Sequence, residues 1–398
     1  MAILLSSGLH GARGQDLTPG TFVQQAAVEA AAPTVALNAP TPPAAMDVSA
    51  RIEFNSNPTL KEGGDNNDVI FEERFGFSRA WRLSDSSFLT LDAQVGYQTY
   101  INHTYLDGLT LNLGGDQGLN LSFTTGPVYW NAYDRPSYTE DPSQSPELSN
   151  VGKYEAFTNA AGVDAFLPVS TAVGILMGYQ RLDYFTIETS ASSLSQNRTS
   201  DMVSLATPVK INAATTVGLA GSVTVTQYHE GNGFSSVAYS AGPFVRAQLT
   251  SVTTAYVIGG LETIDSDDGG GTGGEFFAEA RLTNQCNSRC SEEFDAGRIA
   301  QLGVLSDFLT LDYVRYSEEL NLGTYLKLTG NLFLNHGREM GGVVGETFWQ
   351  YGGGLGLEMP LANDIDLSLG CQWVDKNSNE SGRSYRQSLA TSAIDWTF

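Results

Sequence analysis

The stretch FLTLDAQVGYQTYI, residues 88–101, decides the fold of this chain. Its apolar and polar side chains alternate: Leu89, Leu91, Ala93, Val95, Tyr97 and Ile101 fall on one set of positions, and Thr90, Asp92, Gln94 and Gln98 on the other. Because successive side chains of a strand point to opposite faces, this spacing predicts a strand with one apolar and one polar face. A helix would scatter both sets around its axis.

The same alternation returns along most of the chain. Near the C-terminus Ile365, Leu367, Leu369, Cys371 and Trp373 oppose Asp364, Asp366, Ser368 and Gln372. It recurs in residues 48–54 and 326–334, and more weakly in 69–81, 118–130, 153–166, 171–186, 197–208, 213–228, 234–249, 253–264, 274–284, 298–316 and 346–358. The repetition predicts an all-β protein, because a single alternating segment is a weak signal and a dozen are a strong one.

The linkers between these segments alternate in length. Short turns are expected at 83–87, 168–171, 210–214 and 360–364, and longer polar linkers at 57–68, 131–150, 265–274, 337–345 and 376–382. Short turns at one end and long loops at the other are typical of outer-membrane barrels. We therefore predict a transmembrane antiparallel up-and-down β-barrel over residues 48–398, with about 16 strands (range about 14–18), long extracellular loops and short periplasmic turns.

Composition excludes two other classes. The 21 Lys+Arg and 44 Asp+Glu give a net charge of −23, which disfavours duplex nucleic acid as a partner. The mean hydropathy is −0.15, and no apolar run reaches the roughly 20 residues that a membrane-crossing helix needs. Residues 1–47 end in an Ala/Pro-rich stretch and are predicted to be a tail or an incomplete targeting segment.

The main alternative is a soluble β-sandwich or solenoid, such as a secreted carbohydrate-binding protein, whose buried strands also alternate. The persistence of both faces through so many strands, with charged residues on the polar face, favours the barrel. In a barrel the five tryptophans, several of which lie near predicted strand ends, are expected in girdles at the headgroups. They are Trp81, Trp130, Trp349, Trp373 and Trp396.

Two resemblances to known proteins support this interpretation. The last strand ends with Ile394, Trp396 and Phe398 on one face, which resembles the terminal signal that the barrel-assembly machinery reads in bacterial outer-membrane proteins. The stretch from Arg51 to Pro58, followed by the acidic segment 65–68 and an Arg/Trp turn, is similar to the β-barrel porin type 2 family. This resemblance implies an outer-membrane barrel, in some cases linked to polysaccharide export, and supplies no catalytic residues.

The polar face is expected to line a water-filled lumen and to set its selectivity. The candidate pore-lining residues are Arg51, Glu53, Glu72, Arg74, Asp92, Gln94, Gln98, Lys327, Asn331, Gln350, Asp366 and Gln372. We predict a porin-like channel for passive diffusion of ions or small hydrophilic solutes, with a preference for cations. The alternative is a non-conducting barrel that anchors a partner or takes part in polysaccharide export, with a loop such as 133–149 or the N-terminal tail folded into the lumen.

The remaining chemistry is sparse. Asp265, Asp267 and Asp268 form a weak Ca²⁺ candidate, against the plainer alternative of a solvated acidic loop. Cys286 and Cys290 are expected in a loop and are close enough to form a small disulfide in an oxidising envelope. No metal or nucleophile pattern appears, so no enzyme activity and no resident cofactor are expected. Outer-membrane lipid is the expected partner, and the chain leaves open a homo-oligomer or an envelope partner protein.

Overall fold

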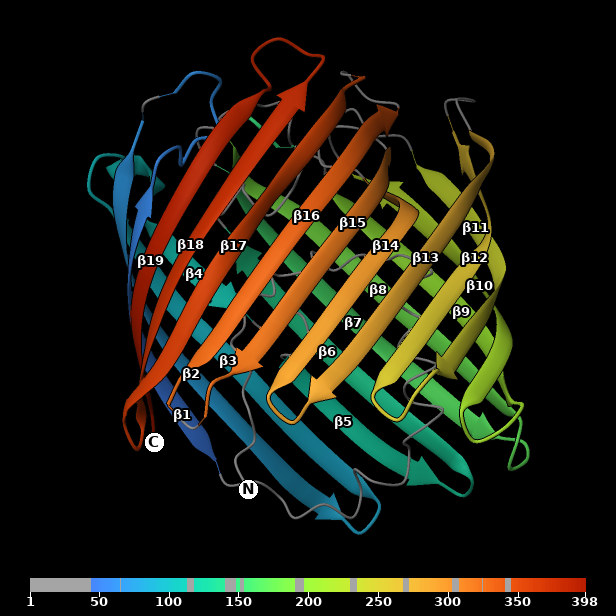
Figure 1. The fold of residues 1–398 in the computed structure, drawn as a ribbon. Coiled ribbons are helices and arrows are strands. Elements are labelled where there is room, and N and C mark those ends of the chain that lie inside the picture. The colour runs from blue at the N-terminus through green and yellow to red at the C-terminus, as the bar shows by residue number, and fades with distance from the viewer. Residues whose placement is uncertain are drawn as a thin grey trace.

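The computed structural model describes residues 44–64, 66–112, 118–139, 148–150, 154–189, 197–229, 235–267, 272–302, 308–323, 325–340 and 345–398. Nearly all of these residues belong to one antiparallel sheet (Figure 1). Its strands are β1 (Ala45–Asn55), β2 (Asp68–Ser84), β3 (Ser87–Tyr100), β4 (Gly108–Asn112), β5 (Gly118–Thr125), β6 (Val128–Thr139), β7 (Tyr154–Pro168), β8 (Gly174–Thr189), β9 (Arg198–Lys210), β10 (Thr215–Tyr228), β11 (Ser236–Gln248), β12 (Thr253–Ser266), β13 (Thr272–Asn287), β14 (Cys290–Leu302), β15 (Phe308–Asn321), β16 (Lys327–Met340), β17 (Thr347–Ala362), β18 (Ile365–Ser378) and β19 (Tyr385–Thr397). A 3-10 turn, Thr104–Leu106, follows β3.

The sheet closes into a barrel. Apart from β4 and β5, each strand pairs with its neighbours in sequence, and β1 pairs with β19 over a continuous register from Asp47 opposite Thr397 to Asn55 opposite Leu389. Closure satisfies the backbone groups that an open sheet would leave unpaired at its edges. Figure 1 shows the short turns gathered at one end, which we call the short-turn end, and the longer connections at the other, the long-loop end.

The barrel has 18 wall positions and not about 16. The sheet has 19 strands, but β4 and β5 both lie between β3 and β6 and share one position, and 19 minus one is 18. The predicted strand 118–130 is in fact two strands, because a hairpin at Gly126 and Pro127 divides it. The predicted strand 298–316 likewise joins parts of β14 and β15.

Two predicted linkers are shorter than expected because their first residues continue a strand. Residues 131–139 belong to β6, where Tyr129 and Tyr133 fall on the same face as Asn131 and blur the alternation. Residues 337–340 belong to β16. The Cys286–Cys290 segment is a tight turn between β13 and β14, not a long loop.

The two faces of the wall differ as the alternation predicts. In β1, Val48, Ala50, Ile52 and Phe54 are exposed, whereas Ser49, Arg51 and Glu53 between them are buried or half-buried. Most of the other strands likewise expose large apolar side chains at alternate positions. A soluble monomer rarely exposes so large an apolar area, so this outer face requires a covering medium. Among the described residues, no helix has the length and apolar character needed to cross a membrane.

Candidate functional site

The candidate site is the inner wall, defined as the side chains that alternate with the exposed apolar ones. All twelve predicted lining residues occupy such positions, in β1, β2, β3, β16, β17 and β18. That they line an open pore remains a prediction. Their contacts divide them into two clusters and a scattered remainder.

The first cluster lies on β1 and β2 around the buried carboxylate of Glu72. Arg74 contacts it through Nε at 2.6 Å, and Arg51 approaches it through Nη1 at 3.6 Å. Arg51 also pairs with Glu53 on its own strand. Gln98 lies directly opposite Glu72 on β3. Two carboxylates and two guanidinium groups therefore hold one another against the wall, as cross-strand ionic neighbours do.

The second cluster is spread over β15 to β19. Near the short-turn end, Lys327 Nζ lies 3.3 Å from Glu319 and 3.8 Å from Glu358. Nearer the long-loop end, the Gln350 amide accepts from Asn335 at 2.9 Å and donates to the Tyr385 hydroxyl at 3.0 Å. The remaining five lining residues, Asp92, Gln94, Asn331, Asp366 and Gln372, are half-buried and lie outside both clusters.

The sequence analysis missed a buried ionic group on the inner wall. We call it the mouth cluster: Lys376, Glu346, Arg383 and Glu339, at the long-loop end of β16 to β19. Lys376 Nζ lies 3.1 Å from Glu346, and both side chains are 0% exposed. Arg383 bridges Glu346 at 2.7 Å and Glu339 at 3.1 Å. Removing charges from water is costly, so such a buried group persists only when its members pair with one another.

A segment from another part of the long-loop end, which we call the mouth, reaches this cluster. Leu148 to Asn150 belong to the connection between β6 and β7. The Asn150 amide donates to the Leu60 carbonyl at 2.8 Å, and Arg383 Nε donates to the Ser149 hydroxyl at 3.4 Å. Leu60 and Leu148 are completely buried. Leu60 belongs to the β1–β2 connection, and strands β2 to β6 separate it along the wall from the β6–β7 connection. The contact therefore spans part of the mouth, and we call it the cross-mouth contact.

The inner wall is not polar throughout. From β7 to β13 it carries a buried apolar belt: Phe166, Leu176, Met202, Ala206, Ala220, Phe244, Tyr256, Ile258 and Phe277. The ring of Phe244 lies so flat on the wall that a Cβ added to Gly218 would approach it within 2.4 Å. A smaller group, Leu309, Leu311, Tyr313 and Phe348, continues the belt toward the mouth cluster. On this side the inner wall therefore combines apolar side chains with polar ones.

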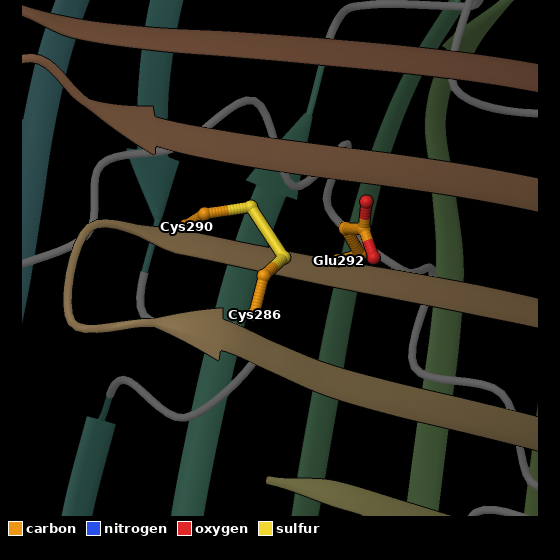
Figure 2. Close-up of side chains that lie close together, drawn as sticks. All are labelled: Cys286, Cys290 and Glu292. Carbon is orange, nitrogen blue, oxygen red and sulfur yellow. A yellow bond between two sulfur atoms is a disulfide. The ribbon is translucent and has the colours of Figure 1, made fainter.

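The other predicted sites lie elsewhere. Cys286 and Cys290 form a disulfide across the β13–β14 turn, with Glu292 on the same outward face (Figure 2). The three form the only potential metal-ligand group among the described residues, and disulfide sulfurs are not thiolate ligands. Asp265 and Asp267 are exposed at the long-loop end, and Asp268 lies outside the described residues. The calcium prediction stays untested.

The outward face carries the terminal residues and the tryptophans. Ile394 and Trp396 near the end of β19 and Phe398 just after it are all exposed. The free thiol of Cys371 on β18 is also exposed, opposite Ala390. All five tryptophans point outward, and three of them, Trp81, Trp130 and Trp396, lie near the short-turn ends of their strands. This placement agrees with the girdle expected for a barrel in a bilayer.

Comparison with known proteins supports the fold. No protein-family model matches the sequence, and no curated protein matches it. Among solved structures, the chain resembles OpdK of Pseudomonas aeruginosa, determined with vanillate, at 10% identity and a TM-score of 0.50, covering 89% of this chain and 99% of that one. It also resembles OccK2 (OpdF) of the same organism, determined with glucuronate, at 9% identity and a TM-score of 0.52, covering 89% and 98%. At these identities the shared property is the closed barrel.

Proposed function

We propose that this protein is an outer-membrane channel that conducts ions or small hydrophilic solutes by passive diffusion. The proposal rests on one observation: a closed barrel of 18 positions carries exposed apolar side chains outside and ionic clusters inside. A barrel of this size is wide enough to enclose an aqueous path. Long loops face the exterior and short turns face the periplasm.

Recording from purified protein in a planar lipid bilayer tests the proposal. We expect discrete conductance steps that scale with salt concentration. Protein that inserts into the bilayer, migrates as a heat-modifiable folded barrel on a gel, and gives no current at any voltage would overturn the channel while leaving the barrel intact.

The channel is proposed to prefer cations. The net charge is −23, and near the short-turn end the inner wall places Asp366 directly opposite Asp395, with Asp47 and Asp92 on β1 and β3. Carboxylates that line a narrow path raise the local cation concentration. The reversal potential under a KCl gradient measures this preference. Asp366→Asn together with Asp395→Asn should shift the potential toward the non-selective value, and Glu73→Gln, which faces outward on β2, should not.

A second function is favoured by the cross-mouth contact. A barrel closed at one end would anchor a partner or serve in polysaccharide export without conducting. Variants that disrupt the contact distinguish the closed barrel from the open channel. If only variants that break the mouth cluster conduct, the native protein is a closed barrel or a gated one. If the native protein already conducts, the cross-mouth contact narrows the mouth without closing it.

The remaining assignments extend this proposal. Insertion would be directed by the barrel-assembly machinery acting on Ile394, Trp396 and Phe398, and the bilayer lipid would cover the outer face. Membership of the β-barrel porin type 2 family stays a prediction that rests on the loose motifs of residues 51–100. The ligands of the two similar structures are both carboxylates, so vanillate and glucuronate are suitable first solutes for a transport assay.

A further inference from the structure

An ordered row of polar side chains crosses the outer face near the long-loop end. Arg298 on β14, Asp312 on β15, His336 on β16 and Trp349 on β17 lie directly opposite one another in successive strand pairs. Arg298 donates to Asp312 through Nε at 2.6 Å and Nη2 at 2.8 Å. His336 Nδ1 lies 3.6 Å from Asp312, and its ring lies 4.5 Å from that of Trp349.

One position nearer the loops, Arg338 lies opposite Thr310 and points outward, exposed. It makes no ion pair within the described part of the chain. Arg298 and Arg338 share a hollow of about 220 Å³ with His336, Asp312, Thr310 and Phe276. Glu275 also lines the hollow and accepts a hydrogen bond from Thr310 at 3.1 Å, so its carboxylate already has a donor.

The hollow coincides with a break in the wall. The β13–β14 ladder ends at Ala278 opposite Arg298, although β13 continues toward the loops from that point and β14 runs on to Leu302. The outer surface is therefore interrupted beside Arg298. A ligand there would meet two guanidinium groups and one imidazole from β14 and β16, beside the carboxylates of Asp312 and Glu275.

The surface below the row is apolar. The next outward residues toward the short-turn end are Ala296, Val314 and Leu334, followed by Phe294 and Leu332, and the large ones are exposed. In the proposed membrane orientation, acyl chains would cover these side chains. The polar row would then lie at headgroup level, where an aromatic residue such as Trp349 is expected.

We propose that this hollow binds the phosphate of a phosphorylated glycolipid in the outer leaflet. Arg298 keeps its pairing with Asp312 and still has N–H donors directed elsewhere, because a guanidinium carries five. Arg338 supplies the second cation, and His336 adds a donor. The apolar rows below hold the acyl chains of the same molecule. This inference rests on the proposed membrane location and does not depend on conduction.

Native mass spectrometry of the detergent-purified full chain, titrated with bisphosphorylated lipid A, tests the site. A basic residue near a charged lipid surface contributes enough to change binding about fivefold. We therefore expect about fivefold weaker binding for Arg298→Gln and for Arg338→Gln, and a larger loss for the double variant. The matched control is Arg79→Gln, an exposed outward arginine near the opposite end of the barrel, which should bind as the native protein does.

Unchanged lipid binding in the double variant, or an equal loss of binding in the Arg79→Gln control, would overturn the proposal. So would equal affinity for lipid A that lacks its phosphates. Displacement of the lipid by millimolar inorganic phosphate would also overturn it, because it would indicate a site for free anions. Heat-modifiable migration of each variant shows that the barrel is folded. Bilayer conductance should be unchanged in all of them, so failure of the channel proposal is distinguishable from failure of this one.

Discussion

Neutralising Glu346 tests whether the mouth cluster holds the cross-mouth contact in place. The carboxylate is fully buried and is shared by Lys376 at 3.1 Å and Arg383 at 2.7 Å. Glu346→Gln keeps the size and hydrogen-bonding capacity of the side chain and removes only its charge. The loss weakens the arrangement in which Arg383 reaches Ser149, so the substitution should favour an open mouth.

The expected magnitude follows from the burial. Breaking a buried ion pair by removing one partner costs about 3–5 kcal/mol. Because Arg383 keeps Glu339 as a second partner, we take the low end, about 3 kcal/mol, which corresponds to a change of about 150-fold in an equilibrium constant. A mouth that is open for about 1% of the time would then be open for more than half of it.

Single-channel recording at fixed voltage measures the open probability of the mouth as the fraction of time that the channel spends at its highest conductance. The matched control is Glu358→Gln on β17, the strand that follows Glu346; its half-exposed carboxylate lies 3.8 Å from Lys327. A partly exposed ion pair of that kind contributes at most about 1 kcal/mol, so the equilibrium constant for opening of the Glu358→Gln variant should change less than about fivefold. A folded Glu346→Gln variant with native open probability would refute the view that the mouth cluster closes the barrel.

Three further predictions concern the faces of the wall. Leu332→Arg, on the exposed apolar face of β16, should destabilise the folded barrel in lipid by about 2–4 kcal/mol, whereas Asn331→Arg on the inner face should not. Urea unfolding in vesicles measures both changes in stability, and equal losses would contradict the assignment of the faces. Brominated lipids should quench the exposed Trp349, Trp373 and Trp396, and native-like fluorescence in their presence would place these rings away from lipid. Thiol titration of unreduced, unfolded protein should find one reactive cysteine, Cys371, and three would exclude the Cys286–Cys290 disulfide.

The strand faces could be predicted because they depend on local information. Alternation with a period of two assigns Glu72, Asp92 and Gln350 to the inner wall without knowledge of their neighbours. The number of strands is harder to predict, since it depends on turns that interrupt an unbroken pattern. The Gly126-Pro127 pair is a two-residue hairpin connection, and it could have been recognised from its turn residues.

The mouth cluster could not be predicted, because its members meet only when the barrel closes. Glu346 is the first residue of a predicted strand and Lys376 the first of a predicted linker, positions at which charged residues are ordinarily solvated. Their pairing requires β17 and β18 to be neighbours. Ser149 reaches Arg383 from 234 residues away in the sequence, and no periodicity carries information over that separation.

The belt on β7 to β13 changes where water can pass. An aromatic ring that lies flat on a glycine has one face against the wall and the other toward the barrel axis. Phe244 lies in this way over Gly218, yet it is only 1% exposed, whereas Leu219 on the outer face of the same region is 64% exposed. The inward side of this belt is therefore covered, and apolar surface of this kind does not hold ions. In the proposed channel, ions would pass closer to the part of the wall that carries the ion pairs of Arg51, Glu72 and Lys327. Its selectivity would then depend on those clusters as well as on the average charge of the chain.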